Sequence, residues 1–315
     1  MMEIRVRQRV TFVSGGTECV GWHYPGSSGA CVVMAAGLGI PHDVGTYRFA
    51  RRFHEAGYSV LSFDYRGFGD SGGQPRQVLS VADQLDDWSA ALRCAARLPE
   101  VEPTRVGIWG SSVSGGHVVV VAARHPDVAA VVAQTPNLDG PASTQNAVRF
   151  QTFSGLWRTA VRAVADTVTG LVGRAPRLIA LAGPPGAVAL LTTPDAQEAG
   201  QAFDPEHPDS TWQPTVAARA MFPLSRYRPS RFVGRVRCPL LMVVADQDQS
   251  ALSAPAVASV RSAVGGELVR LPGGHYSPYL AGHEQAVAAE LDFLLRHLPI
   301  TTAQVEAGAA DTSIG

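Results

Sequence analysis

Along most of the chain, short apolar runs alternate with segments of helical periodicity, and no other feature of the sequence constrains the fold as strongly. Strands are predicted over residues 4–13, 19–24, 30–36, 59–64, 105–109, 128–134, 239–245 and 267–271. Helices are predicted over residues 46–56, 81–98, 113–124, 254–264 and 284–297. The middle strands are continuous apolar runs, which is typical of strands buried on both faces. We therefore predict an α/β fold with a mostly parallel central sheet flanked by helices.

One long segment interrupts this alternation. It is rich in Pro, Gly and Asp, and within it only residues 157–171 and 217–227 have the pattern of amphipathic helices. Because a structureless loop of this length is uncommon inside a compact domain, we predict an inserted cap. The predicted division is a core in two parts, residues 1–136 and 238–299, with the cap at 137–237 between them and a loose C-terminal tail at 300–315.

The charge balance and the cysteines exclude several classes of protein. A net charge of -1 gives no basic footprint for nucleic acid and no acidic tail. The N-terminus lacks the continuous apolar stretch of a signal peptide, and the apolar residues 178–191 are too few to cross a bilayer. We expect a cytoplasmic protein that binds no nucleic acid and no membrane. Neither a zinc site nor a disulfide framework is indicated, because the cysteines are widely separated: Cys19, Cys31, Cys94 and Cys238.

At one predicted strand-to-helix junction the sequence reads G-S-S-V-S, starting at Gly110. A serine at such a junction can project its hydroxyl from a strained turn if the residues two before and two after it are small. Ser112 meets this requirement, since Gly110 lies two positions before it and Ser114 two positions after it, although the usual motif has Gly at the position of Ser114. Ser111 does not meet it, because the bulky Trp109 lies two positions before it. Ser114 stays a sterically allowed alternative, about a turn further into the helix.

A serine hydroxyl is a weak nucleophile until a base activates it, and suitable partners follow the last two predicted strands. His275 lies in a Gly-Gly-His turn at the carboxyl end of the last strand, where α/β sheets place their sites. Two aspartates follow the preceding strand. We favour Asp248 as the partner of His275, because Asp246 comes directly after the strand and suits a turn. Ser112, Asp248 and His275 thus form a predicted triad.

These residues resemble those of the α/β-hydrolase superfamily. Residues 37–39, Gly-Leu-Gly, are similar to the family's His-Gly-x oxyanion loop, with Ala36 in place of the His, and residues 63–73 resemble its F-D-x-R-G-x-G-x-S segment. Taken together, these segments resemble those of the dienelactone-hydrolase and Xaa-Pro-peptidase-like branch of the superfamily, which includes polyketide acyltransferases and thioester hydrolases. The resemblance implies an oxyanion hole made by the backbone N–H groups of Leu38 and Val113. It also implies catalysis without a metal or an organic cofactor.

The predicted triad and the resemblance favour hydrolysis of a carboxylic ester or thioester. In that reaction Ser112 forms an acyl-enzyme, His275 is the general base and Asp248 orients it. The alternatives are transfer of the acyl group to an alcohol or amine, and cleavage of a peptide or carbon–carbon bond by the same residues. A non-catalytic scaffold is disfavoured because the triad is complete. A dinucleotide-binding domain is disfavoured because the segment after Gly110 lacks the G-x-G-x-x-G spacing.

The expected ligand is a small acyl compound held between the core and the cap. Gly37, His42 and Tyr276 are candidate pocket residues because they adjoin the predicted oxyanion loop or the triad, and Phe153 and Trp157 because they are apolar residues of the cap. The rate is expected to rise with pH through a limb near the ordinary histidine pKa of about 6.5. The sequence leaves a homodimer open. Further cap aromatics available to line the pocket are Phe150, Trp212 and Phe222.

Overall fold

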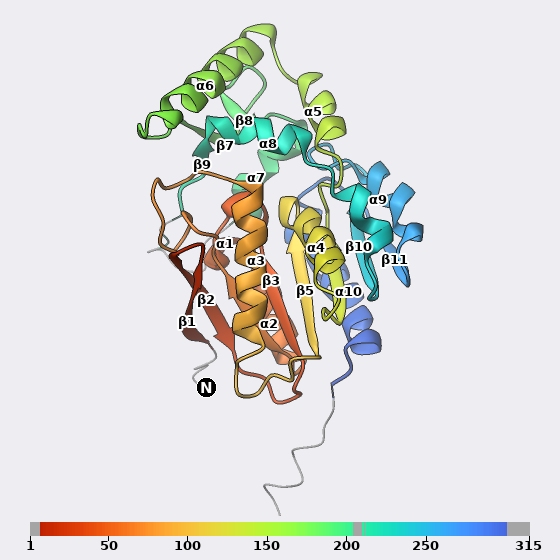
Figure 1. Ribbon diagram of the computed structural model, residues 1–315. Coiled ribbons are helices and arrows are strands. Elements are labelled where there is room, and N and C mark those ends of the chain that lie inside the picture. The colour runs from red at the N-terminus through yellow and green to blue at the C-terminus, as the bar shows by residue number, and fades with distance from the viewer. Residues whose placement is uncertain (1–6, 204–209, 211, 301–315) are drawn as a thin grey trace, which may run out of the picture.

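The computed structural model describes residues 7–203, 210 and 212–300, and its core is an eight-stranded sheet with the order β1-β2-β4-β3-β5-β6-β10-β11 (Figure 1). β1 and β2 form an antiparallel hairpin and β2 pairs antiparallel with β4, while the other strands are parallel. This sheet confirms the predicted fold class. The strands are β1 (Gln8–Ser14), β2 (Thr17–Tyr24), β3 (Cys31–Ala35), β4 (Ser59–Phe63), β5 (Val106–Ser111), β6 (Ala130–Gln134), β10 (Leu240–Ala245) and β11 (Gly266–Leu271).

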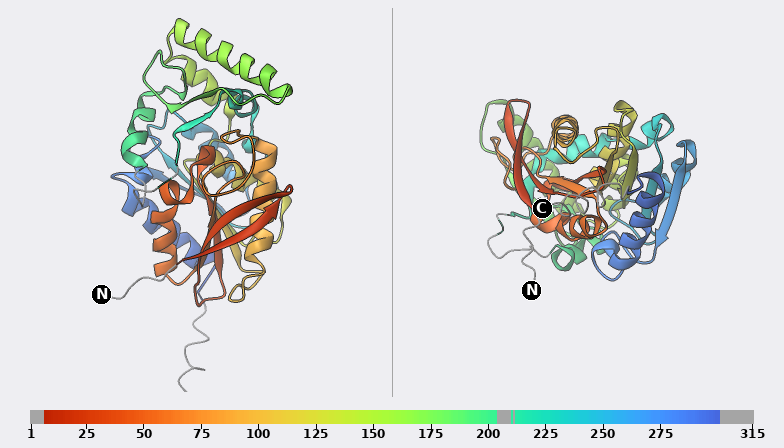
Figure 2. Two further views of the ribbon diagram at one scale, coloured as in Figure 1. Left: turned by 90° about the vertical axis from the view of Figure 1, so that its left-hand side faces the viewer. Right: turned by 90° about the horizontal axis from the view of Figure 1, so that it is seen from below.

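Helices cover both faces of this sheet, which is why every residue of β3, β4, β5, β6 and β10 is buried. α2 and α10 lie on one face, and α3, α4 and α9 lie on the other (Figure 2). Ser80 starts α3 by accepting a hydrogen bond from the Asp83 N–H. These helices are α2 (Tyr47–Glu55), α3 (Val81–Ala95), α4 (Val113–Arg124), α9 (Ser253–Ser259) and α10 (His283–His297).

The segment between β6 and β10 forms a separate layer at the end of the sheet where the parallel strands finish (Figures 1 and 2). It contains a small 3-stranded sheet with the order β8-β7-β9. No helix in the described parts of the chain is long and apolar enough to cross a membrane. The elements of this layer are α5 (Gly140–Val148), α6 (Phe153–Leu171), β7 (Leu178–Ala182), β8 (Ala189–Leu191), α7 (Ala199–Ala202), β9 (Thr215–Ala217) and α8 (Met221–Arg226).

Two of the predictions for this segment need correction. The amphipathic helix expected over residues 157–171 begins earlier, because the Thr152 hydroxyl caps it by accepting from the Gly155 N–H at 3.0 Å. The helix expected over residues 217–227 is shorter: it begins at Met221, after β9 and a 3₁₀ turn. Residues 4–6 of the first predicted strand and residues 301–315 of the predicted tail lie outside the described residues.

A buried ion pair joins α6 to the small sheet. Asp166, on α6, is fully buried. The Asp166 Oδ2 accepts two hydrogen bonds from Arg219, one from the backbone N–H at 2.9 Å and one from the side-chain Nε at 2.8 Å. Oδ1 accepts from the Arg219 guanidinium at 3.0 Å and from the Arg177 N–H, just before β7, at 2.6 Å. A buried carboxylate supplied with this many donors strongly restrains the two segments that provide them relative to α6.

Loss of the Asp166 carboxylate should therefore destabilise the protein. In Asp166→Ala we expect the free energy of unfolding to fall by about 3–5 kcal/mol, because the Arg219 guanidinium and two backbone N–H groups lose their acceptor. Urea denaturation followed by tryptophan fluorescence measures this. Asp246→Ala is the matched control: it removes an exposed pair with Arg270, and the expected change is below about 1 kcal/mol. Equal effects of the two substitutions would contradict the prediction.

Candidate active site

The turn from β5 into α4 holds Ser112 in a backbone conformation that is rare outside glycine, with φ 56° and ψ -119°. Such a conformation costs about 1–3 kcal/mol and persists only where the surrounding structure enforces it. The surroundings here are tight. A Cβ at Gly110 would lie 2.4 Å from the carbonyl oxygen of Ser114, so strand and helix can approach this closely only because Gly110 has no side chain. Ser112 lines the cavity between the core and the overlying layer.

The two neighbouring serines are both committed to other contacts. Ser114 is fully buried; its hydroxyl donates to the Ala36 carbonyl at 2.7 Å and is also hydrogen-bonded to the Tyr65 hydroxyl. Ser111 is buried and accepts a hydrogen bond from the Tyr279 hydroxyl at 2.7 Å. Neither belongs to the lining of the cavity. Ser114 instead connects α4 to the loop that begins after β3.

Ser112, His275 and Asp248 meet in one hydrogen-bonded chain, although they come from three separate loops. His275 Nε2 lies 3.0 Å from the Ser112 Oγ, and His275 Nδ1 lies 2.7 Å from the Asp248 Oδ2. The loops follow β5, β10 and β11, so the parallel sheet brings their ends together. An imidazole held in this way between a carboxylate and a hydroxyl can take the hydroxyl proton as that oxygen attacks.

The structure separates the two candidate aspartates. Asp248 is buried, and its Oδ1 accepts from the N–H groups of Ser250 at 3.0 Å and Ala251 at 2.6 Å, which leaves Oδ2 for the imidazole. Asp246 points away into solvent and pairs with Arg270 at 2.7 Å. Of the two, only Asp248 contacts His275.

The charges around His275 favour its protonated form. Burial opposes that form and by itself would lower the pKa of His275. The charge and the hydrogen bond of Asp248, together with the charge of a second carboxylate, Asp195, outweigh burial and raise the pKa of His275 above its usual value. The site is thus organised to stabilise an imidazolium, the species formed when His275 accepts a proton.

The backbone around Leu38 packs directly against the Ser112 turn. A Cβ at Gly37 would lie 2.8 Å from the Ser112 Cβ and 3.0 Å from the Val113 nitrogen, so this approach requires glycine. Leu38 has a φ of 55°, and both Leu38 and Val113 line the cavity beside Ser112. Val113 is the first residue of α4, so its N–H has no acceptor within the helix. The arrangement suits two N–H donors aimed at one oxygen.

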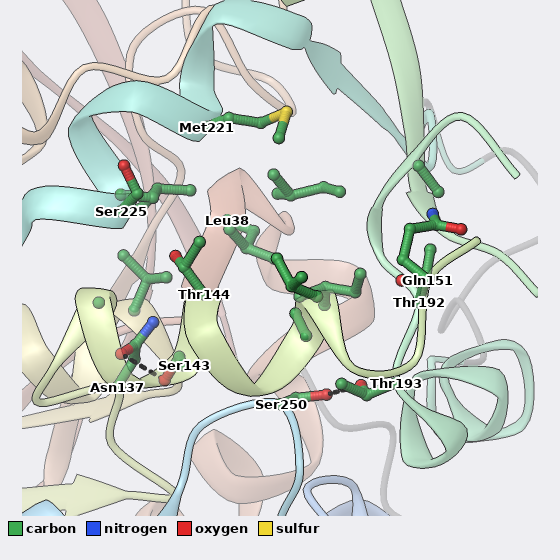
Figure 3. Close-up of a pocket in the computed structure, with 18 of the residues that line it drawn as sticks. Leu38, Asn137, Ser143, Thr144, Gln151, Thr192, Thr193, Met221, Ser225 and Ser250 are labelled. Atoms are coloured by element: carbon green, nitrogen blue, oxygen red, sulfur yellow. Dashed lines mark hydrogen bonds between the residues drawn. The ribbon is translucent and has the colours of Figure 1, made fainter. Parts of the chain in front are cut away.

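Ser112 lines a cavity of about 320 Å³. No Asp, Glu, Lys or Arg occurs in its described lining, part of which is drawn in Figure 3. Among the lining residues that the structure describes, His275 is the only one with a titratable side chain. Apolar side chains mix with hydroxyl and amide groups, some of which bond to one another, such as Thr193 with Ser250 at 2.8 Å. The labelled residues in Figure 3 are Leu38, Asn137, Ser143, Thr144, Gln151, Thr192, Thr193, Met221, Ser225 and Ser250.

Phe153 and Trp157 do not line this cavity, contrary to the prediction. Their side chains are 87% and 65% exposed on the outer face of α6. The helix turns Leu156 and Thr159 toward the cavity instead. The error arose because α6 has apolar residues on both faces, and periodicity alone does not say which face is inside. Of the other cap aromatics considered, Phe222 contributes to the lining.

The remaining predicted pocket residues support the site from behind its wall. His42 is buried and hydrogen-bonded to the hydroxyls of Tyr24 at 3.0 Å and Thr46 at 2.9 Å, which ties it to the core. Gly37 provides close backbone approach and no lining surface. Tyr276 is buried next to His275, with their ring centroids 5.0 Å apart.

Sequence reasoning missed one residue of the site, Asp195. It lies in the Pro194–Glu198 turn of the cap and is buried against the loops of Asp248 and His275. The sequence gives no periodic signal there, because the turn is short and its acid resembles any other in a Pro-rich insertion. An aspartate directly after Thr-Thr-Pro is a common helix-start pattern, which also concealed it.

Comparison with known proteins shows the family of the chain. A family model described as serine aminopeptidase, S33, matches residues 26–184. The quorum-quenching protein AidA of Acinetobacter baumannii is 36% identical over 92% of this chain and 95% of its own length. The thiohydrolase apmlB of Arthrinium phaeospermum is 34% identical over about a third of each chain, 35% and 36%.

Solved structures agree on the fold. The α/β hydrolase GrgF from Penicillium sp. superposes with a TM-score of 0.74 over 93% of this chain and 99% of its own, at 23% identity. The corresponding sequence, a polyketide transferase, is 29% identical over 55% of this chain and 56% of its own length. The chain therefore belongs to the serine aminopeptidase S33 family of the α/β-hydrolase superfamily and is an enzyme of that class.

Proposed function

We propose that the protein is a serine hydrolase that cleaves the ester or thioester bond of a small acyl compound through an acyl-enzyme on Ser112. The observation that carries the proposal is the hydrogen-bonded chain from Ser112 through His275 to Asp248 at the floor of a neutral cavity. Each group has the partner that its role requires, and both the nucleophile and the base line the cavity, whereas Asp248 lies behind them.

In the proposed mechanism the Ser112 Oγ attacks the acyl carbon while His275 Nε2 takes its proton. The resulting oxyanion accepts hydrogen bonds from the N–H groups of Leu38 and Val113, each such donor typically contributing about 3 kcal/mol in the transition state. The imidazolium, stabilised by Asp248, then protonates the leaving alkoxide or thiolate as the bond breaks. Water attacks the acyl-enzyme with His275 again as base, which releases the acid and restores Ser112.

The cavity favours an uncharged acyl chain that carries polar groups. Its lining combines aliphatic residues with hydroxyls and amides, which suits a chain bearing carbonyl or amide oxygens. The relative from Acinetobacter is named as quorum-quenching, and one class of quorum-sensing signal is a lactone, a cyclic ester, that bears an acyl chain. We therefore propose acylated lactones as the first substrate class to test, with linear esters and thioesters beside them.

Peptide hydrolysis, which the family description suggests, is less well supported. An aminopeptidase must bind the ammonium group of its substrate, and a carboxylate near the nucleophile is the usual partner for it. No Asp or Glu occurs in the described lining of the cavity, and the two carboxylates that contact His275, Asp195 and Asp248, are engaged with backbone donors. A bound ammonium ion would lie there without a counter-charge.

Acyl transfer to an alcohol or amine is the second candidate, favoured by the polyketide transferase among the relatives. It differs from hydrolysis only in the nucleophile that releases the acyl-enzyme. A panel of acylated lactones, activated esters and acyl thioesters of graded chain length, each assayed with and without added alcohols and amines, tests both. Free acid as the product in every case supports hydrolysis, and acyl product that rises with acceptor concentration supports transfer. Turnover of no acyl compound in the panel contradicts the proposal.

Ser112→Ala should reduce kcat for the best ester in the panel by about 10⁶-fold, because the oxygen that forms the acyl-enzyme is removed. Its melting temperature should change little, since alanine keeps the Cβ and therefore the same backbone strain at the positive φ, and the hydroxyl that is lost is hydrogen-bonded to His275. Ser114→Ala should stay active, though slower, because Ser114 holds the oxyanion loop through Ala36. Activity retained in Ser112→Ala but lost in Ser114→Ala would identify Ser114 as the nucleophile.

Asp248→Asn should lower kcat by about 10³–10⁴-fold, since an amide leaves the imidazole in the wrong tautomer and withdraws the charge that stabilises its protonated form. Asp246→Asn, in the same loop, should change kcat little, because that carboxylate faces Arg270 and solvent. Steady-state kinetics of the pair at one pH measures the contrast. A larger loss in Asp246→Asn would transfer the role to that residue.

The pH profile of kcat/KM should show a single ascending limb that lies above about 6.5, the ordinary pKa of histidine. The base acts in its neutral form, so activity rises as His275 loses its proton. Because the pKa of His275 is raised, that loss occurs at higher pH than the sequence alone suggested. Rates measured from pH 5 to 9 in one buffer series locate the limb. A limb below the ordinary value would show that burial dominates at His275.

A further inference from the structure

Asp195 extends from the cap into the loops that follow β10 and β11. Its side chain is buried in the 3₁₀ turn Pro194–Glu198. Its Oδ2 accepts hydrogen bonds from the N–H groups of Gln249 at 2.7 Å, Ser250 at 3.2 Å and His275 at 3.3 Å. Its Oδ1 accepts one from the Ser250 hydroxyl at 2.9 Å. One cap residue thereby fixes the backbone of both loops that complete the triad.

Asp195 and Asp248 also share a donor. The Ser250 N–H lies 3.2 Å from an Asp195 oxygen and 3.0 Å from an Asp248 oxygen, so the two carboxylates are neighbours. Two adjacent negative charges repel each other unless donors or a positive charge compensate them. Holding the loop requires only an acceptor, which a neutral amide would also provide. The second charge therefore calls for a further explanation.

The groups facing His275 and Asp195 supply that explanation. Asp248 is hydrogen-bonded to the imidazole from the loop after β10, and Tyr276 adjoins it in the loop after β11. Asp195, in the cap, accepts a hydrogen bond from the backbone N–H of His275 rather than from the ring, and its charge acts on the ring from that position. Glu198 lies on the same turn as Asp195. Burial raises the pKa of Tyr276 above its usual range, and the negative charge of Glu198 acts in the same direction. Burial by itself would raise the pKa of Asp195. The hydrogen-bond donors to Asp195 and the charge of the imidazole outweigh burial, so the pKa of Asp195 lies below its usual value.

The 3₁₀ turn that carries Asp195 follows, in the chain, directly after three residues that line the cavity beside Ser112. Leu191, Thr192 and Thr193 line that cavity, and the Thr193 hydroxyl is hydrogen-bonded to the Ser250 hydroxyl at 2.8 Å (Figure 3). Ser250 in turn donates to Asp195. The cavity wall, the cap turn and the acid loop are thus linked through consecutive hydrogen bonds.

We propose that Asp195 is a positioning residue for the triad, which fixes the loops of Asp248 and His275 from the cap and adds a second negative charge that stabilises the protonated imidazole. The role is defined relative to proton transfer at His275, so this inference rests on the proposed function. Asp195 does not contact the reacting atoms. It acts through His275 and Ser250.

The test is the pH dependence of covalent labelling by an alkyl fluorophosphonate, which requires no knowledge of the substrate. The probe forms a bond from Ser112 Oγ to phosphorus, fluoride leaves, and His275 takes the serine proton. Asp195→Asn keeps the size of the side chain and removes the charge. We expect its labelling limb to move to lower pH by about one unit and its plateau rate to fall about tenfold, because a less basic imidazole activates Ser112 less well.

Two further variants separate charge from structure. Asp246→Asn, in the loop after β10, is the control for loss of a carboxylate charge, and its limb and plateau should match those of the unmodified protein, because that carboxylate pairs with Arg270. Asp195→Glu retains the charge, so its limb should lie closer to the original position than that of Asp195→Asn. Melting temperatures of all variants show whether the fold is kept.

The possible results distinguish this inference from the proposed function. If Asp195→Asn has the limb and plateau of the unmodified protein, or only a lower melting temperature, the role of Asp195 is structural and the inference is overturned. If Asp195→Asn does not fold, the labelling of Asp195→Glu decides. A limb of Asp195→Glu that is shifted as far as the limb of Asp248→Asn also overturns the inference, and a limb of Asp195→Glu at the original pH supports it. If the unmodified protein is not labelled at Ser112, the proposed function fails first.

Discussion

At Ser112 the chain turns from β5 into α4 with a φ of 56°, and the site depends on how closely backbone can approach this turn from either side. Gly110 lets the start of α4 lie against the end of β5, and Gly37 lets the loop after β3 lie against Ser112 itself. Ser114 then secures that loop through the Ala36 carbonyl. The position of Ser112, and of the backbone of Leu38 and Val113 beside it, is consequently set by steric contact, independently of the side chains of His275 and Asp248.

His275 and Asp248 are brought to this turn by the order of the strands. β6, β10 and β11 follow β5 in the sheet in that order and run parallel to it, so the loops that leave β5, β10 and β11 lie at the same end of the sheet. Burial then sets the electrostatics. A buried carboxylate and a buried imidazole act on each other more strongly than exposed groups do, and buried carboxylates need the backbone donors that Asp248 has.

The core of this arrangement could be predicted from the sequence because its signals are local. Continuous apolar runs identify buried strands, and the small residues around Ser112 identify the turn. The choice between Ser112 and Ser114 depended on burial, and that between Asp246 and Asp248 on side-chain direction, neither of which a pattern records. The cap was predicted as an insertion, but its three-residue strands β8 and β9 are too short for periodicity, and the inner face of α6 is no more apolar than the outer. Asp195 depends wholly on tertiary contact.

The cavity beside Ser112 takes most of its described wall from the segment between β6 and β10, whereas Ser112, His275 and Asp248 belong to the core. The residues that shape the cavity and the residues of the Ser112, His275 and Asp248 chain thus come from separate segments of the sequence. A cap exchanged between relatives would carry its own chain-length preference, but the exchange must preserve an acceptor for the N–H groups of Gln249 and His275, which Asp195 now provides. The boundary at which such an exchange can succeed is thus set by a single side chain.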